Sequence, residues 1–519
     1  MKLFILFTFY CIFKCECYKI LAIFPYDGRS HHIYFTALVE ELALRKHNVT
    51  VINYHPVPAL PTLRQISLQE AKENTSDNVN IEEHLKVLST SNFLSVAYGG
   101  AQVFKQMANT NCKKLVNNKE IRELIESKES FDIVIAEQFV TDCGLAVAYK
   151  LNAPVIGMTA HILMSWTYSR LGAPNHPAYV PNHFFASGNY PNLWNRIKST
   201  IINFGMNMYY AHVIQKQNQE IVNAVYPDIP PLEELGKNVS LILINQYFPL
   251  TGSRLQGSNV VEVGGMHIKE NAQIEDKGLK NFLDNAKKDV VFISFGSVAK
   301  NFPQKILDEI KNLIKNNSDI LFIWKLDASN WEPPTNAYVD KWMSQKAILC
   351  HPKVVAFITH SGMLSSSEAM YCGVPIVGVP LFGDQFANAQ SAVESGLGVA
   401  VDILSFNEKV LKDALKTILQ EEYRQKAKLL SQQWKDRPLS PMNTAIFWIE
   451  YVAKYKGVDN LKPSAADLPM YQYLMIDVIL VLGSVFLLLP FAIVKLIFLI
   501  VRKKSIQKSQ KKEKRKKRD

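Results

Sequence analysis

The chain has 519 residues, of which 48% are hydrophobic and 20% charged, and its 23 glycines and 24 prolines exclude a collagen-like or low-complexity protein. Its length suits two large α/β domains. The net charge of +11 does not indicate a nucleic-acid partner, because residues 502–519 carry eleven Lys or Arg against Glu513 and Asp519. The rest of the chain is nearly neutral, so we expect no nucleic acid among its partners.

The N-terminus has the pattern of a cleaved signal peptide. Lys2 precedes the apolar run 3–13, and small residues stand at Cys15 and Cys17, where signal peptidase requires them. We therefore expect residues 1–17 to be removed and the mature chain to begin near Tyr18.

A second apolar segment lies near the other end. Residues 473–501 contain only Asp477 and Lys495 as charges and are long enough to cross about 30 Å of hydrocarbon. The basic residues 502–519 then form a cytoplasmic tail by the positive-inside rule, which leaves the body of the chain on the lumenal side.

The signals around this segment indicate an endoplasmic reticulum glycoprotein, single-pass and of type I. The last four residues, 516–519, resemble the dilysine signal that returns such proteins to that membrane, although an incidental basic tail is the alternative. Glycosylation sequons precede the span at Asn48, Asn74, Asn238 and Asn316.

Cysteine usage predicts neither a metal site nor a catalytic thiol. Three of the seven cysteines leave with the signal peptide. The remaining four show no disulfide or zinc spacing and stand at Cys112, Cys143, Cys350 and Cys372.

The body alternates β-branched strands with amphipathic helices, first over residues 19–244 and again over 290–379, with a linker near 257–265 between them. The elements expected first are strands at 19–24, 49–54, 131–136, 154–159 and 239–244, and helices at 33–46 and 143–150. Those expected second are strands at 290–295, 320–324, 354–359 and 375–379, and helices at 304–315 and 363–371.

This alternation predicts two tandem doubly wound, Rossmann-like α/β domains whose ligands bind at the carboxyl ends of parallel strands. Within the first group, between the strands expected at 154–159 and 239–244, the aromatic and Met-rich segment 191–211 is expected either on the membrane surface or as a buried helix beside the acceptor.

One strand-to-helix junction has the features of a phosphate site. The strand at 354–359 runs into His360-Ser361-Gly362, and the following helix carries Ser365 and Glu368 in its first turns. A helix N-terminus at this edge of a sheet attracts anions, and Gly362 lets the backbone approach closely. His360 and Ser365 can donate to phosphate oxygens and Glu368 can accept from ribose hydroxyls, although a plain packing junction has the same local pattern.

A longer set of segments resembles the donor-binding signature of the UDP-glycosyltransferase family, in particular the animal UDP-glucuronosyl and UDP-glucosyl transferases. The first loop, 28–32, is similar to that of insect members, and the resemblance extends over nearly the whole chain. The segments that carry it are Trp342-Met343-Ser344-Gln345, His360-Ser361-Gly362, Ser365, Glu368, Gly373-Val374-Pro375 and Pro380-Leu381-Phe382-Gly383-Asp384-Gln385.

The resemblance implies a GT-B fold with a single C-terminal transmembrane helix. Residues 18–260 would bind the acceptor, and residues 261–460, including a return helix, would bind the UDP-sugar. The transmembrane helix at 473–501 and the tail at 502–519 would follow.

The same resemblance assigns the nucleotide contacts. Trp342 would stack on the uracil while the backbone of Met343 reads its edge. Gln345 and Glu368 would hold the ribose. Ser344 stands where the family usually has Pro, so the loop that presents Gln345 is expected to be less rigid.

Further contacts are implied around the phosphates and the sugar. His360, Ser365 and Ser297 would take the diphosphate. Asp384 and Gln385 would bind the hydroxyls of the transferred sugar.

Transfer needs stabilisation of the leaving diphosphate and a base for the acceptor hydroxyl. No cofactor or metal is expected, because the chain has no Asp-x-Asp and a helix N-terminus can stabilise the charge. Direct attack would invert the sugar carbon. His31 and His32 both suit the base by chemistry, and the family's position for it selects His31.

Two residues are candidates for the carboxylate that supports this base. The family usually places an Asp at the end of the strand predicted at 131–136, where this chain has Glu137, and Asp142 follows five residues later. Glu137 reaches the base directly, or Asp142 substitutes for it, or Asp142 only caps the helix predicted at 143–150.

The predicted function is therefore inverting transfer of a glycosyl group from a UDP-sugar to a small lipophilic acceptor, as in detoxification. Glucose is preferred over glucuronate, because no Arg is clearly placed to pair a sugar carboxylate. A catalytically impaired UDP-sugar-binding membrane protein is the alternative, and a membrane scaffold a third. The acceptor and the formation of a homo-oligomer are left open.

Overall fold

The computed structural model describes residues 17–69, 79–177, 180, 192–296, 299–327 and 331–517. The predicted signal peptide up to residue 16, the sequon at Asn74, the diphosphate candidate Ser297 and the last two residues lie outside this described part. The chain divides into two compact units, Met1–Pro463 and Ser464–Asp519.

The first unit contains a seven-stranded sheet in which every pair is parallel, in the order β3-β2-β1-β5-β6-β7-β8. Its central strands are apolar and buried on both faces, as helices covering both sides require. The strand order reverses between β1 and β5, which marks this edge as the ligand-binding point. The strands are β1 (Lys19–Ile23), β2 (Asn48–Asn53), β3 (Leu63–Ser67), β5 (Ile133–Glu137), β6 (Val155–Thr159), β7 (Leu241–Ile244) and β8 (Val260–Glu262).

A second parallel sheet, of six strands, has the order β12-β11-β9-β13-β14-β15. Its reversal point lies between β9 and β13. The strands are β9 (Val290–Ser294), β11 (Leu321–Lys325), β12 (Ala337–Asp340), β13 (Val354–Thr359), β14 (Ile376–Gly378) and β15 (Gly398–Ala400).

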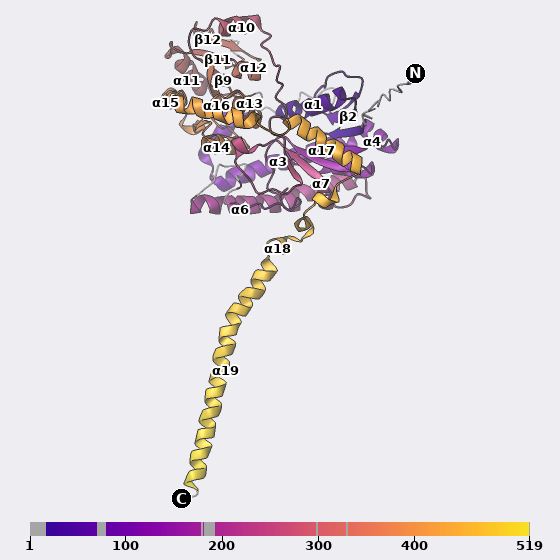
Figure 1. Ribbon diagram of the computed structural model, residues 1–519, viewed down its shortest axis with the longest axis vertical. Coiled ribbons are helices and arrows are strands. Elements are labelled where there is room, and N and C mark those ends of the chain that lie inside the picture. The colour runs from indigo at the N-terminus through magenta and orange to yellow at the C-terminus, as the bar shows by residue number, and fades with distance from the viewer. Residues whose placement is uncertain are drawn as a thin grey trace, which may run out of the picture. The chain divides into compact units, whose positions relative to one another are not determined.

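Helices cover both sheets (Figure 1). The helices that follow strands of the first sheet are α1 (Arg29–Leu44), α3 (Phe93–Asn117), α4 (Lys119–Glu126), α5 (Cys143–Lys150), α6 (Leu193–Tyr209), α7 (Gln215–Asn223), α8 (Leu232–Lys237) and α9 (Phe248–Thr251), with a π-helical turn at Tyr210–Ile214. Those around the second are α10 (Lys277–Asp284), α11 (Gln304–Lys315), α12 (Gln345–Leu349), α13 (Met363–Cys372), α14 (Gln385–Ser395), α15 (Glu408–Ile418) and α16 (Glu421–Lys435).

Segments exchanged between the two halves join them. Strand β4 (Val79–Asn80) pairs with β10 (Ala299–Lys300), and Ile81 of α2 (Ile81–Thr90) is buried in the core of the second sheet. In return, α17 (Pro441–Tyr455) packs into the core of the first sheet beside α1 (Figure 1). These exchanges hold the reversal points of the two sheets within one compact unit.

The predicted fold is confirmed, with two local corrections. Helix α1 begins at Arg29 instead of residue 33, because Gly28 serves as the N-cap, so His31 and His32 lie in its first turn and not in a loop. The predicted linker at 257–265 contains β8, which adds an edge strand to the first sheet.

The segment 191–211, expected either on the membrane surface or as a buried helix beside the acceptor, forms helix α6. This helix is only partly buried. Ile202 and Met206 are buried, whereas Trp194 and Phe204 are 58% and 63% exposed. The helix therefore has apolar side chains on both its inner and its outer face.

The structure contains two disulfides, which the spacing of the cysteines did not predict. Cys112 of α3 is bonded to Cys143 at the start of α5, and Cys350 after α12 is bonded to Cys372 at the end of α13. The partners are separated by 31 and 22 residues, so only the packing of these helices brings them together.

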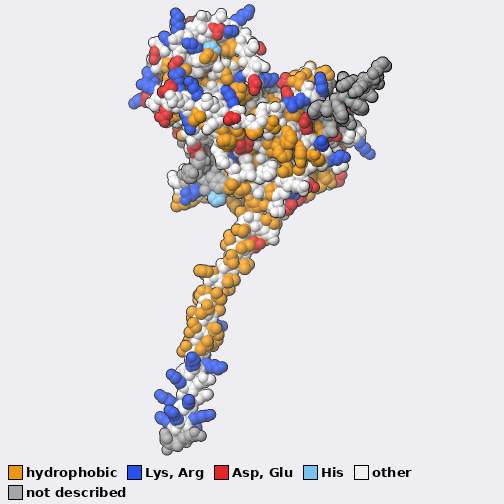
Figure 2. Space-filling model, viewed as in Figure 1, with side chains coloured by type: hydrophobic (Ala, Val, Ile, Leu, Met, Phe, Trp, Pro, Cys, Tyr) orange, Lys and Arg blue, Asp and Glu red, His pale blue; other side chains and the backbone are white. Residues whose placement is uncertain are grey.

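The second unit ends in α19 (Ile476–Lys516), preceded by the short α18 (Met470–Tyr473). Within the described residues, α19 is the single helix long and apolar enough to cross a membrane. Its side chains are hydrophobic over the first part and Lys or Arg toward the C-terminus (Figure 2). The helix thus covers the predicted span from Ile476 onward and most of the predicted tail.

Candidate functional site

The reversal point of the first sheet brings together a histidine and a carboxylate. His31 lies in the first turn of α1, directly after β1, and Glu137 is the last residue of β5. Nδ1 of His31 lies 2.5 Å from Oε1 of Glu137, and both side chains are almost entirely buried. An ionised Glu137 can only accept, and with Glu137 in that state the hydrogen bond puts the imidazole proton on Nδ1 and leaves Nε2 as the acceptor nitrogen.

Aromatic rings surround this pair and remove it from water. Tyr26 packs edge-on against the His31 ring at 4.6 Å, and Phe139 lies at 5.0 Å. Burial lowers the pKa of His31 to about 4, while the charge of Asp384 acts in the opposite direction. Burial also raises the pKa of Glu137. Burial thus disfavours the charged form of both groups, and the imidazole is neutral at physiological pH.

The neighbouring His32 is directed elsewhere. Its Nδ1 lies 3.1 Å from Oγ1 of Thr36 on the same helix, and its ring packs against His55 at 4.9 Å. Successive residues of a helix face different directions, so only one of the two histidines can meet Glu137.

Asp142 lies in a buried hydrogen-bond network that is separate from the contact between His31 and Glu137. Its Oδ2 lies 2.8 Å from Nη1 of Arg170 and accepts hydrogen bonds from Tyr210 at 2.8 Å and from Gln215. Asp142 does occupy the N-cap position of α5, but its side chain makes no capping hydrogen bond. The capping interpretation is therefore wrong, and of the two carboxylates it is Glu137 that contacts His31.

The reversal point of the second sheet contains the predicted phosphate junction. His360 and Ser361 follow β13, and Gly362 is the N-cap of α13 with no side chain capping its first N–H groups. A Cβ atom on Gly362 or Gly296 would come within 2.8 Å of the His360 ring, so both glycines are required for this ring to fit. Burial, and next to it the charge of Lys325, lowers the pKa of His360 to about 4.

The predicted ribose residues lie together, Gln345 at the start of α12 and Glu368 in the middle of α13. Nε2 of Gln345 donates to Oε2 of Glu368 at 2.7 Å and to Oγ of Ser365 at 3.0 Å. Burial raises the pKa of Glu368 to about 7. Sequence reasoning missed His267, a buried residue whose Nε2 lies 3.8 Å from Oε1 of Glu368.

Two cations lie against the indole of Trp342, and neither was predicted. Nζ of Lys325, the last residue of β11, is 4.2 Å from the ring centroid, and Cζ of Arg29 from the start of α1 is 4.8 Å away. Trp342 is 55% exposed, whereas the following Met343 is buried. The indole is thus available for stacking and stands among positive charges that suit an anionic nucleotide.

The last two predicted residues differ in their surroundings. Asp384 accepts from Asn388 at 2.9 Å and is close enough to raise the pKa of both His31 and His161 electrostatically. Oε1 of Gln385, in contrast, accepts from the backbone N–H groups of Leu381 and Phe382, so its amide oxygen is engaged within the loop. Asp384 therefore connects the second sheet's site to the histidine of the first.

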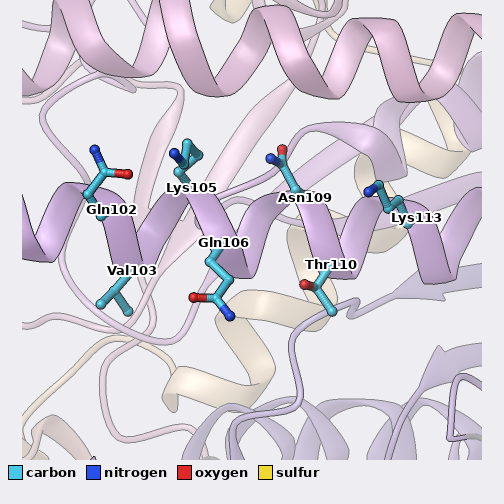
Figure 3. A pocket seen from close by; sticks show the side chains of 7 residues that line it. All are labelled: Gln102, Val103, Lys105, Gln106, Asn109, Thr110 and Lys113. Atoms are coloured by element: carbon cyan, nitrogen blue, oxygen red, sulfur yellow. The ribbon is translucent and has the colours of Figure 1, made fainter.

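A separate hollow lies on the surface of α3 (Figure 3). Its lining has no histidine or carboxylate, and all its residues come from one helix, which makes it unsuitable for the chemistry assembled at the two reversal points. The lining residues are Gln102, Val103, Lys105, Gln106, Asn109, Thr110 and Lys113.

Two doubly wound parallel sheets within one compact unit, joined by exchanged segments, have the architecture of the GT-B fold. The fold comparison agrees, because the solved structure "Glycotransferase of kitacinnamycin" matches with a TM-score of 0.56 over 83% of this chain and 98% of that chain, at 16% identity.

The sequence comparisons define the family. Residues 19–514 match the family model described as UDP-glucoronosyl and UDP-glucosyl transferase, and the chain belongs to this family. It is 32% identical to UDP-glycosyltransferase UGT5 of Dactylopius coccus over 92% of this chain and 91% of that protein. It is 29% identical to UDP-glucuronosyltransferase 1A7 of Mus musculus over 92% and 90%. The chain is thus a transferase that uses a UDP-sugar donor.

Replacing Asp142 tests its structural role. Asp142→Asn leaves Arg170 buried with only Glu233 as a charged partner, so we expect a loss of about 3 kcal/mol of stability with little change in transfer rate. Thermal unfolding and initial rates at low temperature check this. Asp228→Asn, which breaks the exposed pair with Lys150, is the matched control and should leave the melting temperature nearly unchanged. A rate loss at unchanged stability would contradict the assignment.

The pKa of Glu368 predicts a pH dependence of UDP binding. Because burial raises this pKa to about 7, the carboxyl group is largely protonated at pH 6 and ionised at pH 8, the form predicted to accept hydrogen bonds from ribose hydroxyls. We expect UDP affinity, measured by calorimetry, to increase about fivefold over this range, the equivalent of one hydrogen bond. Glu368→Gln should remove this increase apart from the part due to UDP's own ionisation. An identical pH profile in both proteins would exclude Glu368 from the ribose site.

Proposed function

We propose that this enzyme transfers glucose from UDP-glucose to a hydroxyl of a small lipophilic acceptor with inversion of the sugar carbon. The observation that carries the proposal is the 2.5 Å contact between His31 and Glu137, with the charge of Asp384 acting on the same imidazole. These groups would bring a base, its orienting carboxylate and the sugar-binding carboxylate to one point.

His31 acts as the general base in this mechanism. Glu137 holds the proton on Nδ1, so Nε2 takes the proton of the acceptor hydroxyl as its oxygen attacks the sugar carbon. The imidazolium that forms is stabilised by the charge of Glu137 within its buried surroundings. Attack from the side opposite UDP converts an α-linked donor into a β-linked product.

The second sheet would stabilise the leaving UDP. The uncapped N–H groups at the start of α13 point toward developing negative charge, and His360 is placed to donate beside them. Trp342 stacks on the uracil, Gln345 and Glu368 hold the ribose, and no metal is required in this scheme.

The preference for glucose rests on charge. Asp384 suits sugar hydroxyls, which donate hydrogen bonds, but it would repel the carboxylate of a glucuronate. With simple phenols as acceptors, we expect UDP-glucose to be used in preference to UDP-glucuronate in membranes that contain the expressed chain. Faster turnover of the glucuronate donor would reverse this part of the proposal.

We also propose that the enzyme is a detoxifying glycoprotein of the endoplasmic reticulum with its catalytic body in the lumen. Two disulfides support an oxidising compartment, and the described sequon residues Asn48, Asn238 and Asn316 are exposed. A membrane-bound site is accessible to lipophilic acceptors that partition into the bilayer.

Replacing the base tests the mechanism. His31→Ala should lower kcat by about 10²–10⁴, the usual contribution of a positioned base, and leave UDP affinity unchanged. His32→Ala is the matched control and should retain most activity. Glu137→Gln should also lower kcat, because the amide cannot stabilise the imidazolium. The loss should be smaller than in His31→Ala, because the base itself is still present. UDP binding without acceptor-dependent UDP release in the wild type would instead support a catalytically impaired binding protein.

Orientation in the membrane is tested on sealed microsomes. Once detergent has opened the vesicles, endoglycosidase should increase the mobility of the chain, whereas protease added to the sealed vesicles should remove only the basic tail. Replacing Lys516 and Lys517 with Ser should release the protein from the endoplasmic reticulum. A body that is digested in intact vesicles would show the opposite orientation.

A further inference from the structure

A buried histidine lies where the chain crosses from the first sheet to the second. His267 follows β8, the last strand of the first sheet along the chain, and its side chain is 2% exposed. Within the part of the chain that the structure describes, neither ring nitrogen makes a hydrogen bond of ordinary geometry. A buried polar group without a partner destabilises a fold, so packing alone does not explain an imidazole at this position.

The ring of His267 contacts helices of both sheets. Its centroid is 6.0 Å from the ring of Tyr34 on α1, and Arg437 acts on Tyr34 electrostatically. Its Nε2 lies 3.8 Å from Oε1 of Glu368 on α13. Burial lowers the pKa of His267 to about 4, while a contact with the backbone of Leu364 acts in the opposite direction. The imidazole is therefore neutral and has one N–H group to donate.

The two oxygens of the Glu368 carboxyl group have different neighbours. Oε2 accepts a hydrogen bond from Nε2 of Gln345 at 2.7 Å, whereas the group that faces Oε1 is the imidazole of His267. A shift of about 0.8 Å would bring Nε2 of His267 to the usual N–H···O distance of about 3.0 Å. Hydrogen bonds in active sites are often long without a ligand and shorten when it binds.

The cations near Glu368 act on it from a greater distance. Lys325 at the end of β11 and Lys346 on α12 both lower its pKa electrostatically. Nζ of Lys346 donates to the backbone carbonyl of Glu270, and Nζ of Lys325 lies against the indole of Trp342. The imidazole is thus the group placed to orient Oε1.

We propose that His267 is a positioning residue of the ribose site, which donates to Oε1 of Glu368 while Gln345 donates to Oε2. With both oxygens held, the carboxylate keeps one orientation. It offers about four lone-pair positions, so two protein donors leave room for the two hydroxyls of a ribose. This inference rests on the ribose contacts proposed above and concerns donor binding, not the chemical step.

The test compares UDP with 2′,3′-dideoxy-UDP, which lacks both ribose hydroxyls, by calorimetric titration of the full chain. His267→Phe keeps a buried ring without the donor, so it should weaken UDP binding about fivefold and change binding of the analogue by less than about twofold. His267→Gln, whose amide can donate, should recover most of the UDP affinity. In a Glu368→Gln background, His267→Phe should cost nothing further, because its effect passes through that carboxylate.

A second buried histidine provides the matched control. His47 lies beside Glu450, with Nε2 3.1 Å from Oε1, and is 1% exposed. His47→Phe should lower the melting temperature but leave the affinities for UDP and for the analogue unchanged.

Other outcomes separate the possible failures. An equal loss with UDP and the analogue would show that His267 only supports the fold, and a full loss in the Glu368→Gln background would show that it acts elsewhere. Either result, or unchanged UDP affinity in His267→Phe, overturns this inference. Equal binding of the two ligands by the wild type would refute the ribose contact of Glu368 itself, and this inference with it.

Discussion

The arrangement of the site depends on one buried hydrogen bond, between an imidazole in the first turn of a helix and a carboxylate at the end of a strand. Burial disfavours charge on both His31 and Glu137, which keeps the imidazole neutral, and the contact determines which ring nitrogen bears the proton. Around this pair, parallel strands end side by side and the rings of Tyr26 and Phe139 exclude water. The sheet's reversal point between β1 and β5 provides this position.

The second sheet repeats the same geometry for a different purpose. Its reversal point, between β9 and β13, leaves the N-terminus of α13 uncapped, and the glycines around His360 give that ring space. One half of the enzyme thus presents a buried imidazole in contact with a carboxyl group, and the other a helix N-terminus without a side-chain cap. The exchanged segments β4 and α17 hold the two reversal points within one unit, so that Asp384 acts electrostatically on His31.

Much of the site followed from local sequence patterns. The strand-to-helix junction at His360 was visible because glycine, a buried strand and a helix start are all consecutive. Gln345, Ser365 and Glu368 were expected near one ligand and do lie in hydrogen-bond contact. The start of α1 was placed four residues late, since Gly28 caps the helix by its backbone conformation without a side-chain signal.

The sequence by itself determined the two α/β domains, the apolar C-terminal helix and the identity of the residues at each strand end, because these depend on periodicity and adjacency along the chain. Tertiary structure alone decided that Glu137 contacts His31 while Asp142 pairs with Arg170, that four cysteines form two disulfides, and that His267 and Lys325 join the site. These contacts join residues that are distant in sequence or that lie on different strands. Strand order and helix packing, which no local pattern encodes, determine which of them meet.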